Sequence, residues 1–407
     1  MRQNVVVLGS TGSVGVQALD VISGQADRFR VVALTAGGGN PRLLAAQAIE
    51  FEVETVGVAR GTNAQDVQLA LYAEAQRGGY AVGEFRLPRI VVGPDASEQV
   101  AALPCDIVLN AITGAVGLRP TLAALGAGSR LALANKESLI IGGEIVVSAA
   151  KPGQIIPVDS EHSALAQCLR GGTAAEVRRL VLTASGGPFR GRSRSELSAV
   201  TATDALAHPT WSMGPVITTN SSTLVNKGLE VIEAHLLFGI DYDRIEVVVH
   251  PQSMIHSMVE FVDGSTLAQA SPPDMRLPIS LALGWPDRLA EVGQPIDWAQ
   301  AHTWQFEPVD HDAFPGLRLA VAAGRLGGAA PAVLNAANEV CVDAFLAGDL
   351  AYLAIADTVE AVVERSDVLS TGDVITVEDV LGADAWAREQ AALLIDTSAG
   401  PGGPTQS

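Results

Sequence analysis

The first part of the chain alternates short apolar runs with stretches in which apolar residues recur every three or four positions. The apolar runs predict buried strands over residues 4–9, 30–35, 55–58, 89–92, 107–110 and 130–134. The periodic stretches predict helices over residues 13–22, 41–49 and 64–76. Strands that alternate with helices form right-handed βαβ units, which build a doubly wound parallel sheet. We therefore expect an α/β protein in which residues 1–150 form a Rossmann-like domain.

The pattern changes after residue 150. Strand-like runs then alternate with loops and with a helix that begins near Ser222, which is typical of an α+β domain over residues 151–285. Residues 286–312 contain three prolines and predict an extended linker. Residues 313–395 are rich in alanine and leucine with helical periodicity, which predicts a small helical bundle. The Gly/Pro/Ser-rich tail, residues 396–407, is predicted to be disordered.

Composition narrows the class of protein. The 407 residues are 48% hydrophobic, and 26 basic against 45 acidic residues give a net charge of −19. This charge argues against nucleic-acid binding and against attraction to an anionic membrane. No apolar run is long enough to span a bilayer, and the first residues lack the pattern of a signal peptide. The three cysteines have no paired spacing, so we expect no disulfide framework and a cytoplasmic protein.

A glycine-rich turn follows the first predicted strand. The segment GSTGSVG, Gly9–Gly15, opens the first helix, so its glycines would let the backbone approach a pyrophosphate at the helix N-terminus. The alternative is a tight turn without a ligand. No Asp or Glu lies between Val31 and Ile49, where NAD-binding proteins usually hold the ribose 2′-hydroxyl. Nothing there repels a 2′-phosphate, and the Gly37–Asn40 loop, with Arg42 nearby, favours NADPH.

Acidic residues occur in two short polar segments about seventy residues apart. Asp159 and Glu161 lie in PVDSEHS, and Glu230 lies in NKGLE. Three converging carboxylates need a positive charge, because their mutual repulsion would otherwise protonate some of them. Ligands that are all oxygen atoms indicate a hard divalent cation such as Mg²⁺ or Mn²⁺. In an extended strand, residues two apart point to the same face, so we expect Asp159 and Glu161 side by side.

The helix that begins near Ser222 carries the second acidic segment. Its apolar residues form one stripe, and Asn226, Lys227 and Glu230 lie on the opposite side. The alternative for this side is a solvated face with an ordinary Lys–Glu pair. Lysine is scarce: the chain contains 23 arginines but only three lysines, Lys136, Lys151 and Lys227. Lys136 and Lys227 lie in candidate segments. Lysine and arginine are not interchangeable at a crowded site.

Two loops complete the candidate substrate site. Ser185 and the two glycines that follow it end a strand and can form an anion cradle. The segment HPTWSMG, His208–Gly214, carries large side chains that a solvent-facing loop does not need, so it is a candidate lid, the alternative being a loop packed on the core. His250 and His256 are interpreted as structural.

These segments resemble, in order and spacing, the 1-deoxy-D-xylulose-5-phosphate reductoisomerase family over essentially residues 4–395. The matching motifs are GSTGSVG, ALANKESL, PVDSEHSA, LTASGGPF, HPTWSMG, NKGLEVIEAHLLF, HPQSMIHSM and NAANE. The resemblance implies a homodimer with an NADPH-binding domain, a catalytic domain with a flexible flap and a C-terminal helical bundle. It also implies the conversion of 1-deoxy-D-xylulose 5-phosphate to 2-C-methyl-D-erythritol 4-phosphate, a step of the methylerythritol phosphate route to isoprenoids. The divalent metal would be Mg²⁺, Mn²⁺ or Co²⁺.

The resemblance also implies roles for individual residues. The metal ligands and catalytic acids would be Asp159, Glu161 and Glu230, with Lys136 as a further catalytic residue. The substrate would contact Lys136, Ser160, Glu161, Ser185, His208, Ser221, Asn226, Lys227 and Glu230. The cofactor would contact Thr11, Gly12, Ser13, Val14, Gly37, Asn40, Asn135, Glu137 and Gly214, and the flap would carry Trp211 and Met213. One departure is Gly37–Gly39, because many members of the family place Lys or Arg after the first glycine.

Two other functions fit part of the pattern. A simple NADP-dependent dehydrogenase of another phosphorylated metabolite would explain the glycine-rich turn but not the three acids. A nucleotide-binding sensor or scaffold without catalysis would need none of Lys136, Asp159, Glu161 and Glu230. Metal dependence of turnover on the rearranging substrate separates these functions from a reductoisomerase.

Overall fold

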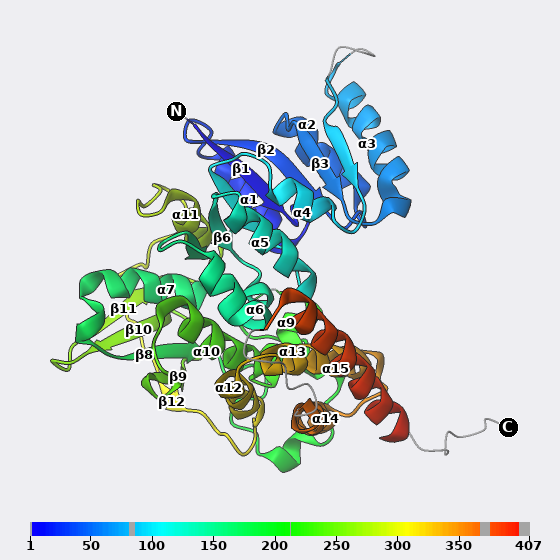
Figure 1. Cartoon of the computed structure of the whole chain (residues 1–407). Coiled ribbons are helices and arrows are strands. Elements are labelled where there is room, and N and C mark those ends of the chain that lie inside the picture. Colours follow the sequence, from blue (N-terminus) through cyan, green and yellow to red (C-terminus); the bar gives the residue numbers. More distant parts are fainter. Residues whose placement is uncertain (1, 81–85, 212, 367–374, 399–407) are drawn as a thin grey trace. The chain divides into compact units, whose positions relative to one another are not determined.

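The structure, a computed structural model, describes residues 2–80, 86–211, 213–366 and 375–398. The chain forms two compact units, which are coloured along the sequence in Figure 1. The first unit comprises Met1–Ser138, Val146–Ser163 and Asp274–Gln294. The second unit comprises Leu139–Ile145, Ala164–Pro273 and Pro295–Ser407.

A seven-stranded parallel sheet forms the centre of the first unit, with strand order β4-β3-β2-β1-β5-β6-β7. Its strands are β1 (Gln3–Leu8), β2 (Phe29–Ala36), β3 (Thr55–Val58), β4 (Arg89–Val92), β5 (Ile107–Asn110), β6 (Arg130–Leu133) and β7 (Ile155–Pro157). The helices are α1 (Ser13–Ser23), α2 (Pro41–Glu50), α3 (Ala64–Arg77), α4 (Ala96–Ala101), α5 (Leu118–Gly126) and α11 (Arg276–Gly284), with short 3₁₀ turns at Gly61–Asn63 and Ala115–Gly117.

The predicted doubly wound sheet is confirmed, and its topology places a binding crevice. Val5, Val6, Val7 and Leu8 of β1 are fully buried, as expected for a parallel strand covered on both faces. The strand order reverses at β1, which pairs with β2 on one side and with β5 on the other. In such sheets ligands bind at the carboxyl ends of the strands beside this reversal. The glycine-rich turn follows directly from the carboxyl end of β1.

Helix α11 lies in the first unit although residues 151–285 were expected to form a separate domain. It contacts α1, β6 and β7, and its residues Ile279 and Leu283 are fully buried. Arg130, at the start of β6, donates hydrogen bonds to the carbonyl oxygens of Leu283 and Trp285. The chain therefore returns to the first unit after the second sheet. Linear sequence pattern gives no sign of such a return, so the expected boundary at residue 285 needs correction.

The second unit contains a mixed five-stranded sheet with strand order β11-β10-β8-β9-β12. Strands β8 and β9 are parallel, and the other neighbours are antiparallel. The strands are β8 (Val177–Ala184), β9 (Ile245–Val249), β10 (Ile255–Phe261), β11 (Thr266–Ala270) and β12 (Glu307–Pro308). The helices are α8 (Ala202–Ala205), α9 (Pro215–Ser222), α10 (Val225–Phe238), α12 (Gly316–Leu326), α13 (Ala330–Ala347), α14 (Tyr352–Glu364) and α15 (Val377–Ser398). Short 3₁₀ turns span Leu169–Gly171, Ala174–Glu176, Arg194–Leu197 and Tyr242–Arg244, and α6 (Lys136–Ala149) and α7 (Ser160–Cys168) contain residues of both units.

The sheet and the C-terminal helices of the second unit share one hydrophobic core. Leu182 of β8, Leu229 of α10, Leu317 of α12 and Val342 of α13 belong to the same buried cluster. The expected helical bundle is present, but it does not form a compact unit apart from the sheet. The expected linker, residues 286–312, is divided between the units and contains β12, which pairs with β9. Separate periodicities along the sequence do not reveal that two elements will share a core.

The ends of the expected segments also shift. Helix α15 extends to Ser398, three residues into the tail that was expected to be disordered, and residues 399–407 of that tail lie outside the described residues. No helix within the described parts of the chain has the length and apolarity needed to cross a membrane.

Candidate active site

The glycine-rich turn joins β1 to α1 and is closely packed. Gly9 has a φ of +77°, and a Cβ atom there would lie 2.6 Å from the carbonyl oxygen of Ala111. A Cβ atom at Gly15 would lie 2.3 Å from the carbonyl oxygen of Gly9. Gly12 is the N-cap of α1 and has no side chain to accept the N–H groups of the first turn. The turn therefore presents backbone donors at a helix N-terminus, which suits a pyrophosphate.

A buried glutamine fixes this turn against the next helix. Ser10 donates from Oγ to Oε1 of Gln47 at 2.9 Å, and Nε2 of Gln47 donates to the carbonyl oxygen of Ser10 at 2.9 Å. Both residues are buried. The predicted cofactor residues Thr11, Ser13 and Val14 lie in the same turn and at the start of α1. Sequence reasoning did not identify Gln47, whose only signal is a polar residue on the buried face of an otherwise apolar helix.

A second group of predicted cofactor residues lies at the carboxyl end of β6. Asn135 is the N-cap of α6 and accepts the N–H of Ser138 at 3.2 Å. Its Nδ2 donates to Oε2 of Glu137 at 2.8 Å and to the carbonyl oxygen of Gly114 at 3.1 Å. The first unit thus brings Asn135 and Glu137 to the carboxyl edge of the sheet that also carries the glycine-rich turn. Gly214 lies in the second unit, and its role at the cofactor stays a prediction.

The predicted metal-binding acids of the first unit, Asp159 and Glu161, lie at a strand-to-helix turn, and the expected extended geometry is wrong. Strand β7 ends at Pro157, and Ser160 begins α7. The N–H of Ser163 donates to the carbonyl oxygen of Asp159 at 2.8 Å, which makes Asp159 the residue that precedes the first helical turn. Glu161 therefore lies within that turn. Negative charge at this position is stabilised by the helix dipole, an effect that an apolar run in the sequence does not reveal.

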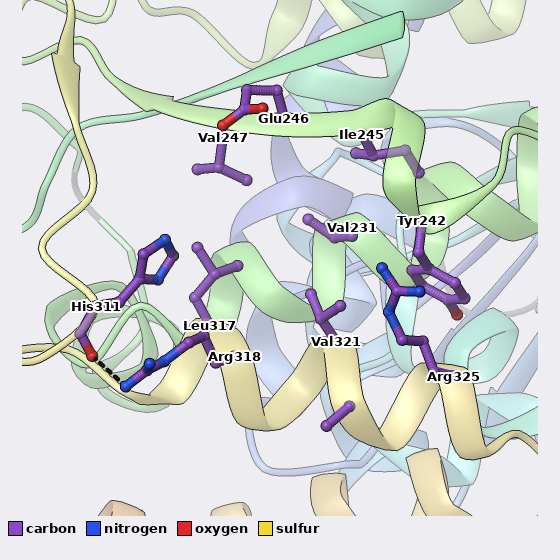
Figure 2. Close-up of a pocket in the computed structure, with 11 residues that line it drawn as sticks. Val231, Tyr242, Ile245, Glu246, Val247, His311, Leu317, Arg318, Val321 and Arg325 are labelled. Atoms are coloured by element: carbon purple, nitrogen blue, oxygen red, sulfur yellow. Dashed lines mark hydrogen bonds between the residues drawn. The ribbon is translucent and has the colours of Figure 1, made fainter.

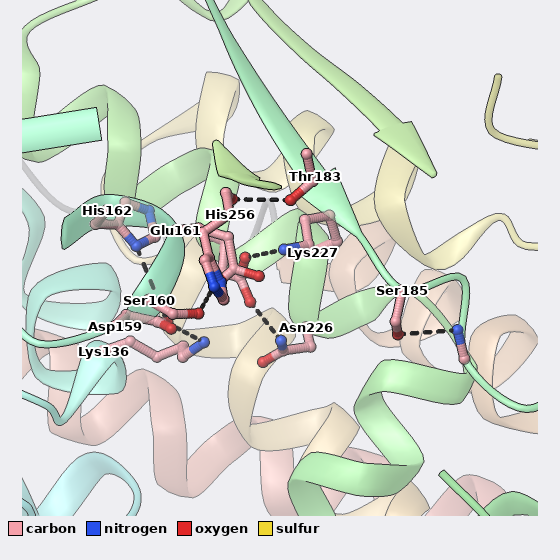
Figure 3. A network of polar contacts seen from close by, with 12 residues as sticks. Lys136, Asp159, Ser160, Glu161, His162, Thr183, Ser185, Asn226, Lys227 and His256 are labelled. Carbon is pink, nitrogen blue, oxygen red and sulfur yellow. Dashed lines mark hydrogen bonds and ion pairs between the residues drawn. The ribbon is translucent and has the colours of Figure 1, made fainter. Parts of the chain in front are cut away.

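Each of these acids has a polar partner within the first unit. Lys136, at the start of α6, forms an ion pair with Asp159, and the two side chains are only 13% and 15% exposed. Ser160 donates from Oγ to Oε2 of Glu161. The buried His162 has its Nδ1 atom 4.0 Å from Oδ2 of Asp159. Figure 3 shows Lys136, Asp159 and Ser160 close together. Sequence reasoning did not assign His162, although it stands next to two candidate residues.

Helix α10 carries the remaining acid, and the alternative of a solvated polar face is wrong. Lys227, Glu230 and Glu233 are 5%, 2% and 0% exposed, as buried as the apolar residues of the helix. Within the second unit, α9, α12 and β9 pack against this helix. Lys227 and Asn226 both donate to the carboxylate of Glu230. A solvated Lys–Glu pair is therefore excluded, and Glu233, one turn from Glu230, is a buried acid that sequence reasoning missed.

The predicted anion cradle pairs Ser185 with His208 within the second unit. Nε2 of His208 lies 3.0 Å from Oγ of Ser185, and Nδ1 of His208 accepts the N–H groups of Thr210 at 3.1 Å and Trp211 at 2.9 Å. Because Nδ1 is an acceptor, the proton of the neutral ring is on Nε2, which donates to Ser185. Burial lowers the pKa of His208 and so favours this neutral form. Gly187 N–H also donates to Ser185 Oγ, at 3.2 Å.

Ser185 Oγ accepts hydrogen bonds from His208 and from Gly187, so its own hydroxyl proton is available for a ligand. The cradle lies against the end of α9, because a Cβ atom on Gly187 would be 3.0 Å from the carbonyl oxygen of Ser221. Gly187 has a φ of +65°, which glycine adopts without strain. Leu224, between α9 and α10, also has a positive φ, of 59°, and its buried side chain holds this unfavourable turn in place. The turn brings Ser221 and Asn226 to the same end of the second unit.

The expected flap lies in the same unit as His250, which follows β9, and His256, which lies in β10. The rings of Trp211 and His256 are 6.2 Å apart, and residue 212 lies outside the described residues. His250 accepts the N–H groups of Met254 and Ile255 at Nε2, and its Nδ1 lies 2.8 Å from the carbonyl oxygen of Gln305. These backbone contacts support a structural role for His250. The flap roles of Trp211 and Met213 stay predictions.

A pocket of about 330 Å³ in the second unit contains none of the predicted site residues (Figure 2). Its lining is mainly apolar and also includes two arginines, a glutamate and a histidine: Val231, Tyr242, Ile245, Glu246, Val247, His311, Leu317, Arg318, Val321, Ala322 and Arg325. Arg318 donates to the carbonyl oxygen of His311, and Arg325 forms an ion pair with Asp243. Both arginines thus have partners, and the chemistry described above lies elsewhere.

Comparison with known proteins identifies the family. The 1-deoxy-D-xylulose 5-phosphate reductoisomerase family model matches residues 5–143, and models of two C-terminal domains of that enzyme match residues 155–238 and 270–390. A 1-deoxy-D-xylulose 5-phosphate reductoisomerase from Kitasatospora griseola is 60% identical over 391 residues, which are 96% of this chain and 99% of that protein. The chain belongs to the 1-deoxy-D-xylulose 5-phosphate reductoisomerase family.

Other members of the reductoisomerase family agree in sequence and in structure. The protein of that name from Streptomyces coelicolor is 61% identical over 96% of this chain and 92% of its own length. A solved reductoisomerase in complex with NADPH, fosmidomycin and magnesium is 37% identical, with a TM-score of 0.89 over 98% of this chain and 99% of that one. The Zymomonas mobilis reductoisomerase in complex with NADPH is 40% identical, with a TM-score of 0.86 over 98% of this chain and 100% of that one.

Proposed function

We propose that the protein converts 1-deoxy-D-xylulose 5-phosphate to 2-C-methyl-D-erythritol 4-phosphate with NADPH and a divalent metal, in the methylerythritol phosphate route to isoprenoids. Membership of the reductoisomerase family and the NADPH and magnesium complexes of its solved members support this function. The observation that carries it is the pair of shielded acid–lysine contacts, Lys136 with Asp159 and Lys227 with Glu230. Burying charged groups costs desolvation free energy even when they are paired, so a role in function explains these two pairs better than a gain in stability does.

Asp159, Glu161 and Glu230 are the proposed ligands of the metal. Their donor atoms are all carboxylate oxygens, and no sulfur or nitrogen ligand is needed, which fits Mg²⁺, Mn²⁺ or Co²⁺. Asp159 and Glu161 belong to the first unit and Glu230 to the second, so the ligand set rests on the acids themselves and on the family. A bound cation would act as a Lewis acid toward the substrate's carbonyl and neighbouring hydroxyl.

Lys136 is the proposed electrostatic catalyst. Its ammonium group is held by Asp159 at the N-terminus of α6, where it can face the substrate's oxygens together with Ser160. Negative charge on these oxygens must grow while the carbon skeleton rearranges. A preoriented cation in a partly dry site stabilises this charge without reorganising solvent.

The phosphate of the substrate is assigned to the second unit. Ser185, with its available proton, Ser221, Asn226 and Lys227 would donate to it. His208 would orient Ser185 through Nε2. Binding energy from this remote group would drive closure of the Trp211 loop over the reacting carbons.

The cofactor is assigned to the glycine-rich turn and the adjoining strand ends. Donors of the Gly12–Val14 backbone would hold the pyrophosphate, and Asn135 and Glu137 would line the same edge of the sheet. NADPH would supply the hydride for the reduction. The Gly37–Asn40 loop follows β2 and is assigned to the 2′-phosphate end.

We further propose a cytoplasmic homodimer. Strand β11 lies at an edge of the five-stranded sheet; its residue Leu267 is 41% exposed, and Val262, which follows β10, is 64% exposed. An exposed edge strand is a common pairing surface between copies of a chain. Cys105, Cys168 and Cys341 are free thiols, which fits a reducing compartment.

The test is NADPH oxidation with 1-deoxy-D-xylulose 5-phosphate, with and without a chelator. We expect turnover that EDTA abolishes and that Mg²⁺ or Mn²⁺ restores. Glu230→Gln should lose at least about a thousandfold in kcat, because a metal ligand and its charge are removed, while NADPH affinity stays within about twofold. Chelator-resistant turnover, or a Glu230→Gln enzyme with near-normal kcat, would refute the metal-dependent function and favour a simple dehydrogenase.

A further inference from the structure

Arg60 lies beside the glycine loop that follows β2, although it is more than twenty residues away in sequence. Strands β2 and β3 are parallel neighbours, and their last paired residues are Ala36 and Val58. The ladder continues past both strand ends, because Ala59 N–H donates to Ala36 O at 3.0 Å and Arg60 N–H donates to Gly37 O at 3.3 Å. Arg60 therefore stands directly across from the loop at which the 2′-phosphate of NADPH is expected.

The side chain of Arg60 lies on the side of this loop. Arg60 has extended backbone angles, φ −91° and ψ 106°. Residues two apart in an extended chain point the same way, so Arg60 shares the direction of Val58. Val58 faces the loop, since its Cγ1 atom would lie 3.1 Å from a Cβ atom on Gly38.

The loop itself is firmly held and leaves open space. Nδ2 of Asn63 donates to the carbonyl oxygen of Gly38 at 2.7 Å, and Gly38 has a φ of +94°. In contrast, a Cβ atom on Gly37 or Gly39 would meet no atom within 4 Å. The loop thus offers room and backbone groups but no charge of its own, because it contains no basic side chain.

Arg60 is well placed to supply that charge. It is exposed, and its guanidinium forms no ion pair with any residue in the described ranges. By contrast, Arg30 in the neighbouring strand β2 is already held in an ion pair with Glu54. Arginine binds phosphate through two parallel N–H groups, a geometry that lysine cannot reproduce.

We propose that Arg60 binds the 2′-phosphate of NADPH and is the main determinant of NADPH over NADH selectivity in this chain. The inference rests on the proposed NADPH-dependent function and adds to it a residue from the β3–α3 connection. Arg42, at the second position of α2, is the competing cation, since it is also exposed and follows the loop directly in the chain.

The test measures binding directly, in the full-length protein, apart from turnover. Dissociation constants are obtained for NADPH and NADH by nicotinamide fluorescence, and for 2′,5′-ADP and 5′-AMP, which differ only in the 2′-phosphate, by calorimetry. Arg60→Ala should weaken NADPH and 2′,5′-ADP about tenfold or more, as expected for loss of a charge-assisted hydrogen bond. NADH and 5′-AMP should change less than about twofold, which also shows that the variant is folded.

Arg89→Ala is the matched control. Arg89 is likewise exposed and has no ion pair with the described residues, but it starts β4 and pairs with Thr55, so it lies at the amino ends of the strands and not at the carboxyl ends that lead to the glycine loop. This variant should leave all four constants unchanged. The loss on Arg60→Ala should also shrink as salt rises, because the contact is between charges.

Several outcomes would overturn the inference. Equal weakening of NADPH and NADH would show that Arg60 contacts the shared adenosine, and unchanged selectivity with a loss on Arg42→Ala would assign the phosphate to Arg42. An equal effect of Arg89→Ala would indicate only the general charge of the unit. A protein that binds NADPH through Arg60 but does not convert 1-deoxy-D-xylulose 5-phosphate would refute the proposed function and leave this inference standing.

Discussion

At the scale of single residues, burial decides which polar side chains of this chain have a chemical role. The sequence shows Lys227 and Glu230 three residues apart, a spacing equally typical of a solvated helix surface. Only the packing around α10 shows that both are buried. His208 was predicted to lie in a lid loop. The direction of its hydrogen bonds could not be predicted from the sequence, because it depends on how the backbone of residues 208–211 folds.

The protonation of His208 predicts how substrate affinity depends on pH. Burial lowers the pKa of His208 below its ordinary value of 6.5. The neutral ring, whose Nδ1 accepts two N–H groups, is therefore fully present above that value and is lost as pH falls through the lower pKa of the folded protein. His208→Ala should raise KM for the substrate roughly thirtyfold at pH 8, since two hydrogen bonds of about 1 kcal/mol each are lost and about 1.4 kcal/mol corresponds to a factor of ten.

This penalty should shrink at acidic pH, where wild-type His208 is itself protonated and can no longer accept. The measurement is the ratio of KM values, variant to wild type, from pH 8 down to the lowest pH that the fold tolerates. The ratio removes the titration of the substrate phosphate, which is common to both enzymes. A ratio that stays constant or grows as pH falls would contradict the neutral-acceptor role.

At the scale of elements, the apolar pattern predicted the strands and helices of the first unit, but it did not predict the residues at which a strand ends and a helix begins. The apolar runs at residues 55–58, 89–92 and 107–110 became β3, β4 and β5 with the same bounds. The run before Asp159, in contrast, ends at Pro157, and the acids lie in a helical turn. Apolar periodicity reports burial and therefore cannot locate the residue at which a strand changes into a helix.

The joint between β1 and α1 offers a test of close packing. Gly15→Ala would place a Cβ atom 2.3 Å from the carbonyl oxygen of Gly9 and 2.6 Å from Cα of Ser10, so the turn must shift away from α1. We expect NADPH affinity to fall at least about tenfold, because the backbone donors of the turn lose their alignment, and stability to fall by about 1–3 kcal/mol. Isothermal calorimetry with NADPH and urea unfolding measure the two effects.

Gly24→Ala is the control at the other end of the same helix. Gly24 has a φ of −68°, and the nearest atom to a Cβ there would be 3.7 Å away. Alanine fits this position, so NADPH affinity should stay within about twofold of the wild-type value. Normal NADPH binding by Gly15→Ala, with Gly24→Ala unchanged, would show that the turn does not hold the cofactor.

At the scale of the whole molecule, contacts that join distant parts of the sequence set the organisation. Residues 274–294 return to the first unit, and the C-terminal helices complete the core of the sheet in the second. Neither was predictable, because each depends on surfaces that only the folded chain creates. The resemblance to the reductoisomerase family fixed the function and the fold class, but the compact units had to be found in the structure.

This organisation predicts a division of ligand binding between the two units. The predicted pyrophosphate turn, Gly9–Gly15, lies in the first unit, and the predicted phosphate groups, Ser185 and Ser221, lie in the second. Ligands that bind one native segment lower its rate of local opening and so slow its amide exchange. Hydrogen–deuterium exchange with mass spectrometry can therefore assign each ligand to its unit.

NADPH alone should slow exchange in peptides that cover residues 9–16 and 37–43. Glycerol 3-phosphate, a probe with the phosphate but without the reacting carbonyl, should instead slow exchange at residues 185–187 and across the turn between α9 and α10. Its binding is weak, so we expect roughly twofold protection at a probe concentration near the dissociation constant. Ser185→Ala should abolish the second effect and spare the first, because Ser185 belongs to the second unit and to no predicted cofactor contact. Protection of the glycine-rich turn by the phosphate probe, with none at residues 185–187, would reverse the assignment of the two anion sites.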